Sequence, residues 1–442
     1  MFKMAKNEFK IAKGVRDWYG QDAILRNEIK DILRRVFERY GYNPIETPMI
    51  ERAETIKFKG GEEIQKEIFT LKDQGKRELA LRFDQTLPLA RFVASSKDIK
   101  FPFKRYVIGE VFRDGPTQPE QGRYRVFTQC DVDILGVKDM TAEAELLALA
   151  ADVFKELGLG NIIIKINNRK LLDGILDYVS IPKSKKFKTI IALDKRDKIG
   201  NEGVKKELLC FLSKETVNKL VKLIQVKKTN KQTYQGLAKV ISSTNGKQGL
   251  DEIKQLLEYS ESLGLDFVEF DPSLARGLDY YTGTTIEVYL KDKSVVKSAV
   301  LAGGRFDNLI GDFIGGKKEI PAVGFSFGLE RVAMILRDYK KSLKTSNTEL
   351  YLTLVTVHKT ISDSFGNPCF FSSILIYSRT SNILDFIFAF PPTGSANTLP
   401  QTRHLTFEDD FPNIICSFLH FGHLTLINFD FGSLIFSIKH HL

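Results

Sequence analysis

Polar side chains occupy one face of a predicted strand in the first half of the chain. Every second residue there is polar or aromatic, in the order Arg125, Phe127, Gln129, Asp131 and Asp133. Alternate residues of a strand share a face, and the residues between these five are mostly apolar. The pattern favours the floor of a polar ligand pocket, although a solvent-exposed sheet face would show the same alternation.

Arginines mark three of the segments, and two of them, Arg113 and Arg331, stand where a guanidinium could meet a phosphate or another anion. Arg113 ends the preceding predicted strand, beside the loop Asp114–Gly122, which is rich in Gly, Pro and Gln. Arg276 precedes a glycine, and Arg331 lies in the first turn of a predicted helix, where the helix dipole disfavours a cation. A guanidinium binds phosphate through two parallel hydrogen bonds. Taken singly, Arg113 and Arg331 could each be a surface arginine, whereas the segment that holds Arg276 is more distinctive.

Two further segments carry polar or aromatic groups at informative spacing. Asp84 and Thr86 share a face if their segment is a strand, and Asp84 could then pair with an ammonium group. Tyr280 and Tyr281 are framed by glycines, which permit a close approach of the backbone to a ligand. A second glycine-framed loop follows at Ala302–Asp307.

The elements that position these residues can be predicted from periodicity and turn signals. Apolar residues at three- and four-residue spacing predict helices, and short alternating runs predict strands, two of which form an antiparallel hairpin. Strands before and after a helical insertion indicate an α+β fold with a mixed sheet. The predicted helices are Asp22–Tyr40, Thr141–Leu157 and Gly328–Tyr339, and the predicted strands are Ile45–Ile50, Glu78–Thr86, Arg105–Arg113, Arg123–Leu135, Thr284–Leu290 and Ala322–Phe327.

The composition of the chain is globular and its charge is uneven. The formal net charge is +10, yet residues 360–442 hold three basic and six acidic side chains, so the positive charge belongs to the residues before them. An excess of basic residues in this part of the chain is typical of a protein that binds a polyanion. A solvated lysine-rich surface explains the excess equally well. Four scattered cysteines without metal-ligand spacing, and the lack of a secretory signal or a membrane-spanning apolar run, predict a cytoplasmic protein with no membrane partner.

The ordered set of segments resembles the histidyl-tRNA synthetase family of class II aminoacyl-tRNA synthetases. The helix ending at Tyr40 with Pro44–Pro48 looks like the first class II motif, the hairpin from Gly109 to Asp133 like the second, and Gly328–Arg331 like the third. The segments Arg276–Tyr281 and Ala302–Asp307 look like the two peptides typical of the histidine enzymes. Arg169–Gly174 and Asp194–Lys195 look like the archaeal or eukaryotic-type branch.

The resemblance implies a function: activation of L-histidine with ATP, then transfer of the histidyl group to tRNA(His). It implies that Asp84 and Thr86 bind the ammonium side of histidine, that Gln129 and Asp133 hold the ammonium group or the imidazole, and that Tyr280 and Tyr281 pack around the ring. Arg113 and Arg276 would be the catalytic residues, on the α-phosphate and the substrate carboxylate. Arg123 and Phe127 would frame ATP and Arg331 would take the γ-phosphate.

The same resemblance implies ATP as a substrate with Mg²⁺, no metal site built by the protein itself, and a homodimer. The alternative is a regulatory or catalytically incomplete paralogue that binds histidine or tRNA without productive charging. Such relatives tend to lose the arginines that handle ATP, whereas Arg113, Arg276 and Arg331 are all present here. A third possibility is a core that forms the adenylate but charges tRNA poorly.

The predicted domains follow from shifts in composition. Residues 1–164 and 266–343 are predicted to form the catalytic core, with a mostly helical insertion at 165–265 and the start of an α/β anticodon-binding domain at 344–357. Beyond it, residues 358–442 read as an aberrant or divergent tail: all six histidines lie from His358 onward, and 13 of the 33 phenylalanines lie in residues 360–442. We expect a frameshift, a mispredicted exon or a rearrangement to have produced this tail, and transcript sequencing tests that expectation.

Overall fold

The computed structural model divides into two units, Met1–Leu343 and Lys344–Leu442, and each is described by itself. The structure describes residues 10–59, 65–277, 280–292, 296–316 and 318–339, together with the backbone of nine strands between residues 349 and 440. No helix in these described ranges is long and apolar enough to cross a membrane.

The first unit is built on an eight-stranded sheet in the order β1-β5-β6-β11-β10-β9-β7-β8. Its centre, from β5 to β7, is antiparallel, while β1 pairs with β5 and β8 with β7 in parallel. The sheet is therefore mixed, which confirms the predicted α+β class. Its strands are β1 (Asn43–Pro44), β5 (Phe103–Phe112), β6 (Val126–Leu135), β7 (Ile162–Asn168), β8 (Val268–Phe270), β9 (Thr284–Leu290), β10 (Leu301–Arg305) and β11 (Ala322–Gly328).

The predicted hairpin is confirmed. β5 and β6 pair antiparallel from Phe103 opposite Leu135 to Phe112 opposite Val126. The loop between them contains a short 3-10 helix, η1 (Pro119–Gln121), and closes with a bridge between Gln118 and Arg123. Strand β6 begins at Val126, so the Arg123–Arg125 part of the predicted strand belongs to the loop.

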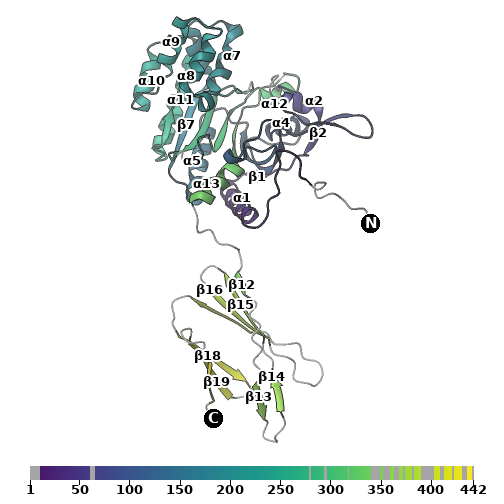
Figure 1. Ribbon diagram of the computed structural model, residues 1–442. Helices are drawn as coiled ribbons and strands as arrows, with labels where there is room; N and C mark the ends of the chain where they lie inside the picture. The colour runs from purple at the N-terminus through teal and green to yellow at the C-terminus, as the bar shows by residue number, and fades with distance from the viewer. Residues whose placement is uncertain are drawn as a thin grey trace. The chain divides into compact units, whose positions relative to one another are not determined.

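Three helices cover one side of the sheet centre: α1 (Gln21–Arg39), α5 (Thr141–Glu156) and α13 (Leu329–Tyr339). Helix α1 packs against the other two, and the three labels lie together in Figure 1. Leu33, Val36 and Phe37 of α1 are fully buried, and the Phe37 ring lies 6.0 Å from that of Phe327 in β11. The amphipathic spacing read from the sequence thus buries the expected face.

The segment predicted to be a helical insertion contains six helices, drawn in teal at the upper left of Figure 1. β7 spans the predicted start of this insertion at Lys165 and is a strand of the large sheet. Its successor α6 packs closely against α11, where a Cβ on Gly249 would lie 2.4 Å from the backbone nitrogen of Leu171. The helices are α6 (Arg169–Tyr178), α7 (Lys183–Asp194), α8 (Arg196–Leu209), α9 (Lys214–Leu223), α10 (Asn230–Ala238) and α11 (Thr244–Ser262).

A small sheet, ordered β2-β4-β3, corrects two predicted strands. The predicted strand Ile45–Ile50 is not formed: β1 ends at Pro44 and β2 starts at Ile50. The predicted strand Glu78–Thr86 stops at Leu81, and Thr86 is the first residue of helix α4. The elements here are β2 (Ile50–Arg52), α2 (Ala53–Lys57), β3 (Thr70–Lys72), β4 (Glu78–Leu81) and α4 (Thr86–Ser95), with α12 (Leu309–Phe313) packed on α4.

The described backbone of the second unit consists of antiparallel strands. They form a four-stranded sheet, β12-β15-β16-β17, a two-stranded β13-β14 ribbon and a three-stranded β18-β19-β20 sheet. The remaining residues of the predicted tail, and all of its side chains, lie outside the described residues. The strands are β12 (Glu349–Tyr351), β13 (Lys359–Ser362), β14 (Pro368–Phe371), β15 (Ile374–Thr380), β16 (Ile383–Ala389), β17 (Arg403–Glu408), β18 (Asn413–His420), β19 (His423–Asp430) and β20 (Phe436–His440).

Candidate active site

The floor of the candidate site is one face of β6. Gln129, Asp131 and Asp133 follow one another along it, as the alternation predicted. The residues opposite them in the neighbouring strand β11 are small: Gly328, Ser326 and Gly324, respectively. The small residues of β11 leave room on that side of the polar side chains, whereas on the other side β5 places Arg105 opposite Asp133.

Buried acceptor atoms are left without partners on this floor. Asp131 is 4% exposed, and its Oδ1 and the Gln129 Oε1 have no hydrogen-bond partner among the residues that the structure describes. Asp133 Oδ2 lies 2.5 Å from Nη2 of the buried Arg105. Burial raises the pKa of Asp131 to about 7 and that of Asp133 to about 6, and Arg105 opposes both shifts. Buried acceptors are normally satisfied, so the floor suits a ligand that brings N–H donors.

The Asp84 carboxylate lies at the start of α4 rather than in a strand. Its Oδ1 accepts hydrogen bonds from the backbone nitrogens of Thr86, at 3.1 Å, and Leu87, at 2.9 Å. Burial raises the pKa of Asp84, while these two bonds and Arg113 act in the opposite direction. Asp84 and Thr86 are therefore brought together by a helix start and not by the strand alternation expected from the sequence.

The Arg113 guanidinium contacts two aromatic rings at the end of the hairpin. Its guanidinium carbon lies 4.3 Å from the ring centre of Phe83 and 5.0 Å from that of Phe127. Its Nε donates to the Phe83 carbonyl at 3.2 Å. A guanidinium stacked in this way keeps one plane and leaves its outer nitrogens for a ligand.

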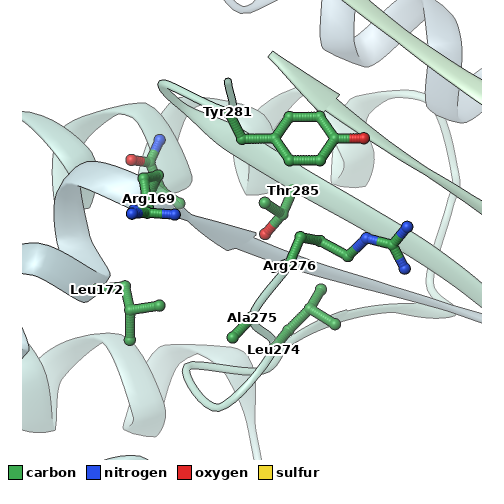
Figure 2. Close-up of a pocket in the computed structure, with 8 residues that line it drawn as sticks. Arg169, Leu172, Leu274, Ala275, Arg276, Tyr281 and Thr285 are labelled. Atoms are coloured by element: carbon green, nitrogen blue, oxygen red, sulfur yellow. The ribbon is translucent and has the colours of Figure 1, made fainter. Parts of the chain in front are cut away.

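Arg276 lies beside a small pocket where the Leu274–Ala275 segment passes β7 and β9. Figure 2 shows its side chain next to Thr285, with Tyr281 above and Arg169 on the far side. Arg276 Nη1 is 2.7 Å from Oε1 of Glu287 in β9.

The paired tyrosines pack against each other and against a third ring. Tyr281 lies 5.1 Å from Tyr280 between ring centres, and Tyr280 packs edge-on against Phe306 at 6.2 Å. Burial raises the pKa of Tyr281 to about 12, so its hydroxyl stays neutral. Leu278 and Asp279 of this predicted peptide lie outside the described residues.

Arg331 joins the other arginines from the start of α13. Its Nη1 donates to the Ala299 carbonyl at 2.7 Å. Burial lowers the pKa of Arg331, and Arg276, Arg123 and Arg113 each lower it further. Arg123 Nη2 lies 3.8 Å from Oε1 of Glu67. The structure thus brings together four arginines that the sequence scatters over more than 200 positions, and such mutually repelling cations suit a polyanionic ligand.

Several functional or supporting residues were missed by sequence reasoning. Asp131 was noted on the polar face but not assigned to the site. Arg105 and Ser326 gave no signal of their own, because only strand pairing places them opposite Asp133 and Asp131. Glu287 gave none either, because it reaches Arg276 through a side-chain ion pair between distant segments of the fold. Conversely, the second glycine-framed loop supplies a structural group: Arg305 is buried and paired with Glu143 at 2.6 Å.

Replacement of Gly324 by alanine should weaken binding at this floor. A Cβ there would lie 2.0 Å from Asp133 Oδ1 and 2.5 Å from the Val132 carbonyl, so Asp133 must move. We expect Gly324→Ala to raise the KM for the amino-acid substrate by about tenfold or more. Gly236→Ala, in α10, is the control, since its Cβ would meet nothing within 4 Å. Equal KM values in the two variants would contradict the placement of Asp133.

Comparison with known proteins identifies this arrangement. The model of the histidyl-tRNA synthetase family matches residues 14–332. The chain belongs to the histidyl-tRNA synthetase family. Among curated relatives, it is 44% identical to histidine–tRNA ligase 1 of Bacillus cereus over 349 residues, which span 78% of this chain and 80% of that protein. It is 39% identical to the histidine–tRNA ligase of Gloeobacter violaceus over 347 residues, which span 72% and 73% of the two chains.

Solved structures agree with the family. The histidyl-tRNA synthetase of Nostoc superimposes with a TM-score of 0.66 at 31% identity, covering 77% of this chain and 79% of that one. A Bacillus halodurans protein described as an ATP phosphoribosyltransferase regulatory subunit/histidyl-tRNA synthetase gives a TM-score of 0.64 at 27% identity, covering 74% and 83%. These neighbours confirm the class II fold.

The named relatives are bacterial, and this corrects the branch expected from Arg169–Gly174 and Asp194–Lys195. In the structure, the first segment opens α6 and the second links α7 to α8.

Proposed function

We propose that this member of the histidyl-tRNA synthetase family is a histidine–tRNA ligase that condenses L-histidine with ATP and passes the histidyl group to tRNA(His). The observation that carries the proposal is the convergence of Arg113, Arg123, Arg276 and Arg331 beside a floor of buried acceptors. Cations for a triphosphate and acceptors for an amino acid are thereby adjacent. A regulatory paralogue would not need all four arginines.

The first step needs alignment and charge neutralisation more than proton transfer. The histidine carboxylate, with a pKa near ~3.5, is ionised at neutral pH and attacks the α-phosphorus directly. A carboxylate oxygen–phosphorus bond forms, the bond from the α-phosphorus to the bridging oxygen breaks, and pyrophosphate leaves with that electron pair. Arg113 and Arg276 would stabilise the charge on the α-phosphate oxygens, and Arg331 would hold the γ-phosphate. Arg123 and Phe127 would frame the nucleotide.

Histidine would be held by the floor and its surroundings. Asp84 and Thr86 at the start of α4 would receive the ammonium group, and Gln129 and Asp133 would meet the ammonium group or the imidazole. Asp131 joins this set because its unpartnered Oδ1 lies on the same strand face. Tyr280 and Tyr281 would pack around the ring.

Other partners follow from the proposed reaction. The described residues contain no group of three His, Cys, Asp or Glu side chains that could hold a metal ion. By resemblance to the family, the Mg²⁺ that accompanies ATP would be held on the ATP phosphates, whose oxygens it favours, and no step above is assigned to it. The basic helices α6 to α11 would face the acceptor arm of tRNA. A homodimer and a cytoplasmic location are further parts of the proposal.

Histidine binding should depend on pH. The floor carboxylates must be ionised to accept a cationic ammonium group, and the pKa values of Asp131 and Asp133 are raised to about 7 and 6. Both are largely protonated at pH 5.5 and ionised at pH 8, so affinity for histidine rises with pH. We expect the KM for histidine to fall by about tenfold between these values. Because the imidazole of histidine itself titrates with a pKa of about 6.5, the difference between the wild-type and Asp131→Asn profiles is the diagnostic readout. Asp131→Asn should shift the midpoint downward; an unchanged profile would contradict this role for Asp131.

The decisive experiment compares two activities of the purified chain. Histidine-dependent exchange between ATP and pyrophosphate measures adenylate formation, and charging of tRNA(His) measures the full reaction. We expect exchange with histidine and none with other amino acids; no exchange at all would overturn the proposed function. Exchange without charging would indicate an active core that lacks adequate tRNA contacts, which is the outcome expected if residues 358–442 do not form an anticodon-binding domain.

A further inference from the structure

Arg276 differs from the other three arginines in having a buried carboxylate partner. Its Nη1 lies 2.7 Å from Glu287 Oε1, and the Glu287 side chain is 8% exposed. Arg113 and Arg331 instead donate to backbone carbonyls. Arg123, whose side chain is 36% exposed, lies 3.8 Å from the Glu67 carboxylate. Of these four guanidinium groups, Arg276 is the one tied to a fixed negative charge.

Glu287 is itself held in place. Its Oε2 accepts a hydrogen bond from the Tyr289 hydroxyl at 2.5 Å. Thr285, Glu287 and Tyr289 are alternate residues of β9 and share one face, and Thr285 lies beside Arg276 in Figure 2. Glu287 lies in a strand and accepts a hydrogen bond from Tyr289 of the same strand. Its carboxylate therefore has little freedom to move, and it can hold the Arg276 guanidinium in one orientation.

The contact leaves one edge of the Arg276 guanidinium uncommitted. Its Nε is buried and has no hydrogen-bond partner in the described part of the chain. Because the guanidinium is planar, anchoring Nη1 fixes the direction of the remaining N–H groups. Burial lowers the pKa of Arg276, but Glu287, with Tyr281 and Asp194, more than reverses the shift. The group therefore stays charged among three neighbouring cations.

We propose that Glu287 is a positioning residue for adenylate formation, which anchors Arg276 through Nη1 so that its remaining N–H groups meet the α-phosphate. The inference rests on the proposed function. In this proposal Glu287 neither binds substrate nor transfers a proton. It orients Arg276 through their ion pair, and Tyr289 orients Glu287 through its hydrogen bond. An arginine aligned in advance loses less conformational freedom when the transition state forms.

The test replaces the carboxylate by its neutral isostere in the full chain. In histidine-dependent ATP–pyrophosphate exchange, we expect Glu287→Gln to lower kcat by about 10- to 100-fold, since a small misalignment of a catalytic group has effects of that size. The KM for histidine should change by less than about threefold. Tyr289→Phe should lower kcat in the same direction by a smaller factor.

The matched control is Glu51→Gln. Glu51 is a similarly buried carboxylate, 6% exposed in its side chain, that pairs with Arg91 at 2.8 Å outside the arginine cluster. We expect it to affect thermal stability and not kcat. In an Arg276→Ala background, Glu287→Gln should add no further loss, because the residue that it positions is absent.

The outcomes separate the two proposals. Losses that multiply in the double variant, or a kcat that Glu287→Gln leaves unchanged, would overturn the positioning role while leaving the exchange activity of the wild-type chain intact. A wild-type chain without exchange would overturn the proposed function and this inference with it.

Discussion

Substitution of Arg113 by alanine should reduce histidine activation by about 10³-fold in kcat/KM, since one preorganised donor to a developing anion contributes that much. Arg113 contacts two rings and one backbone carbonyl, and no ion pair joins it to a carboxylate in the described ranges of the chain. The loss should be in kcat more than in the KM for histidine, because the charge on the α-phosphate grows in the transition state. Pyrophosphate exchange measures it.

Two further variants distinguish charge from geometry. Arg113→Lys keeps the charge and loses the planar fork, so it should recover only part of the activity. Arg77→Ala removes an exposed arginine that pairs with Asp73 and should leave exchange unchanged. A folded Arg113→Ala variant within tenfold of the wild type would show that Arg113 does not act on the α-phosphate.

The second large effect concerns stability. Glu330 Oε1 lies 2.5 Å from Nη1 of Arg26, and both side chains are less than 10% exposed. The same carboxylate accepts from the Thr128 backbone nitrogen at 3.1 and 3.2 Å. Glu330→Ala leaves the buried Arg26 guanidinium without a carboxylate, although its hydrogen bond to Thr128 Oγ1 at 2.9 Å remains, and it removes the acceptor of a strand N–H. The free energy of unfolding should therefore fall by about 3–5 kcal/mol. Urea denaturation of the full chain measures the change.

An exposed ion pair provides the comparison. Arg52 and Glu54 lie 3.0 Å apart with side chains 76% and 70% exposed, and Glu54→Ala should change the free energy of unfolding by less than about 0.5 kcal/mol. Replacement of both Arg26 and Glu330 by apolar residues of similar volume should recover part of the loss. Equal effects of Glu330→Ala and Glu54→Ala would contradict the burial of the Arg26–Glu330 pair.

The sequence by itself determined the elements whose signals are local. The alternation from Gln129 to Asp133 predicted both the strand and the face on which these residues lie, because side chains on a strand repeat every two residues. The apolar spacing of α1 predicted its buried face for the same kind of reason. The alternating pattern predicts a strand through Thr86, but a helix starts there instead. The backbone N–H groups of Thr86 and Leu87 donate hydrogen bonds to Asp84, and these bonds stabilise the helix start.

Only the tertiary structure decided which arginines are enclosed by carboxylates. Arg276 and Arg305 both lie beside glycines, yet Arg305 is enclosed by Glu143 and Asp307, while Arg276 keeps its Nε unpartnered near three other cations. Arg331 and Glu330 are adjacent in the sequence, but Glu330 turns inward to Arg26, 304 positions away. Whether a charge is neutralised depends on which distant strands and helices pack beside it, and that information is not contained in local spacing.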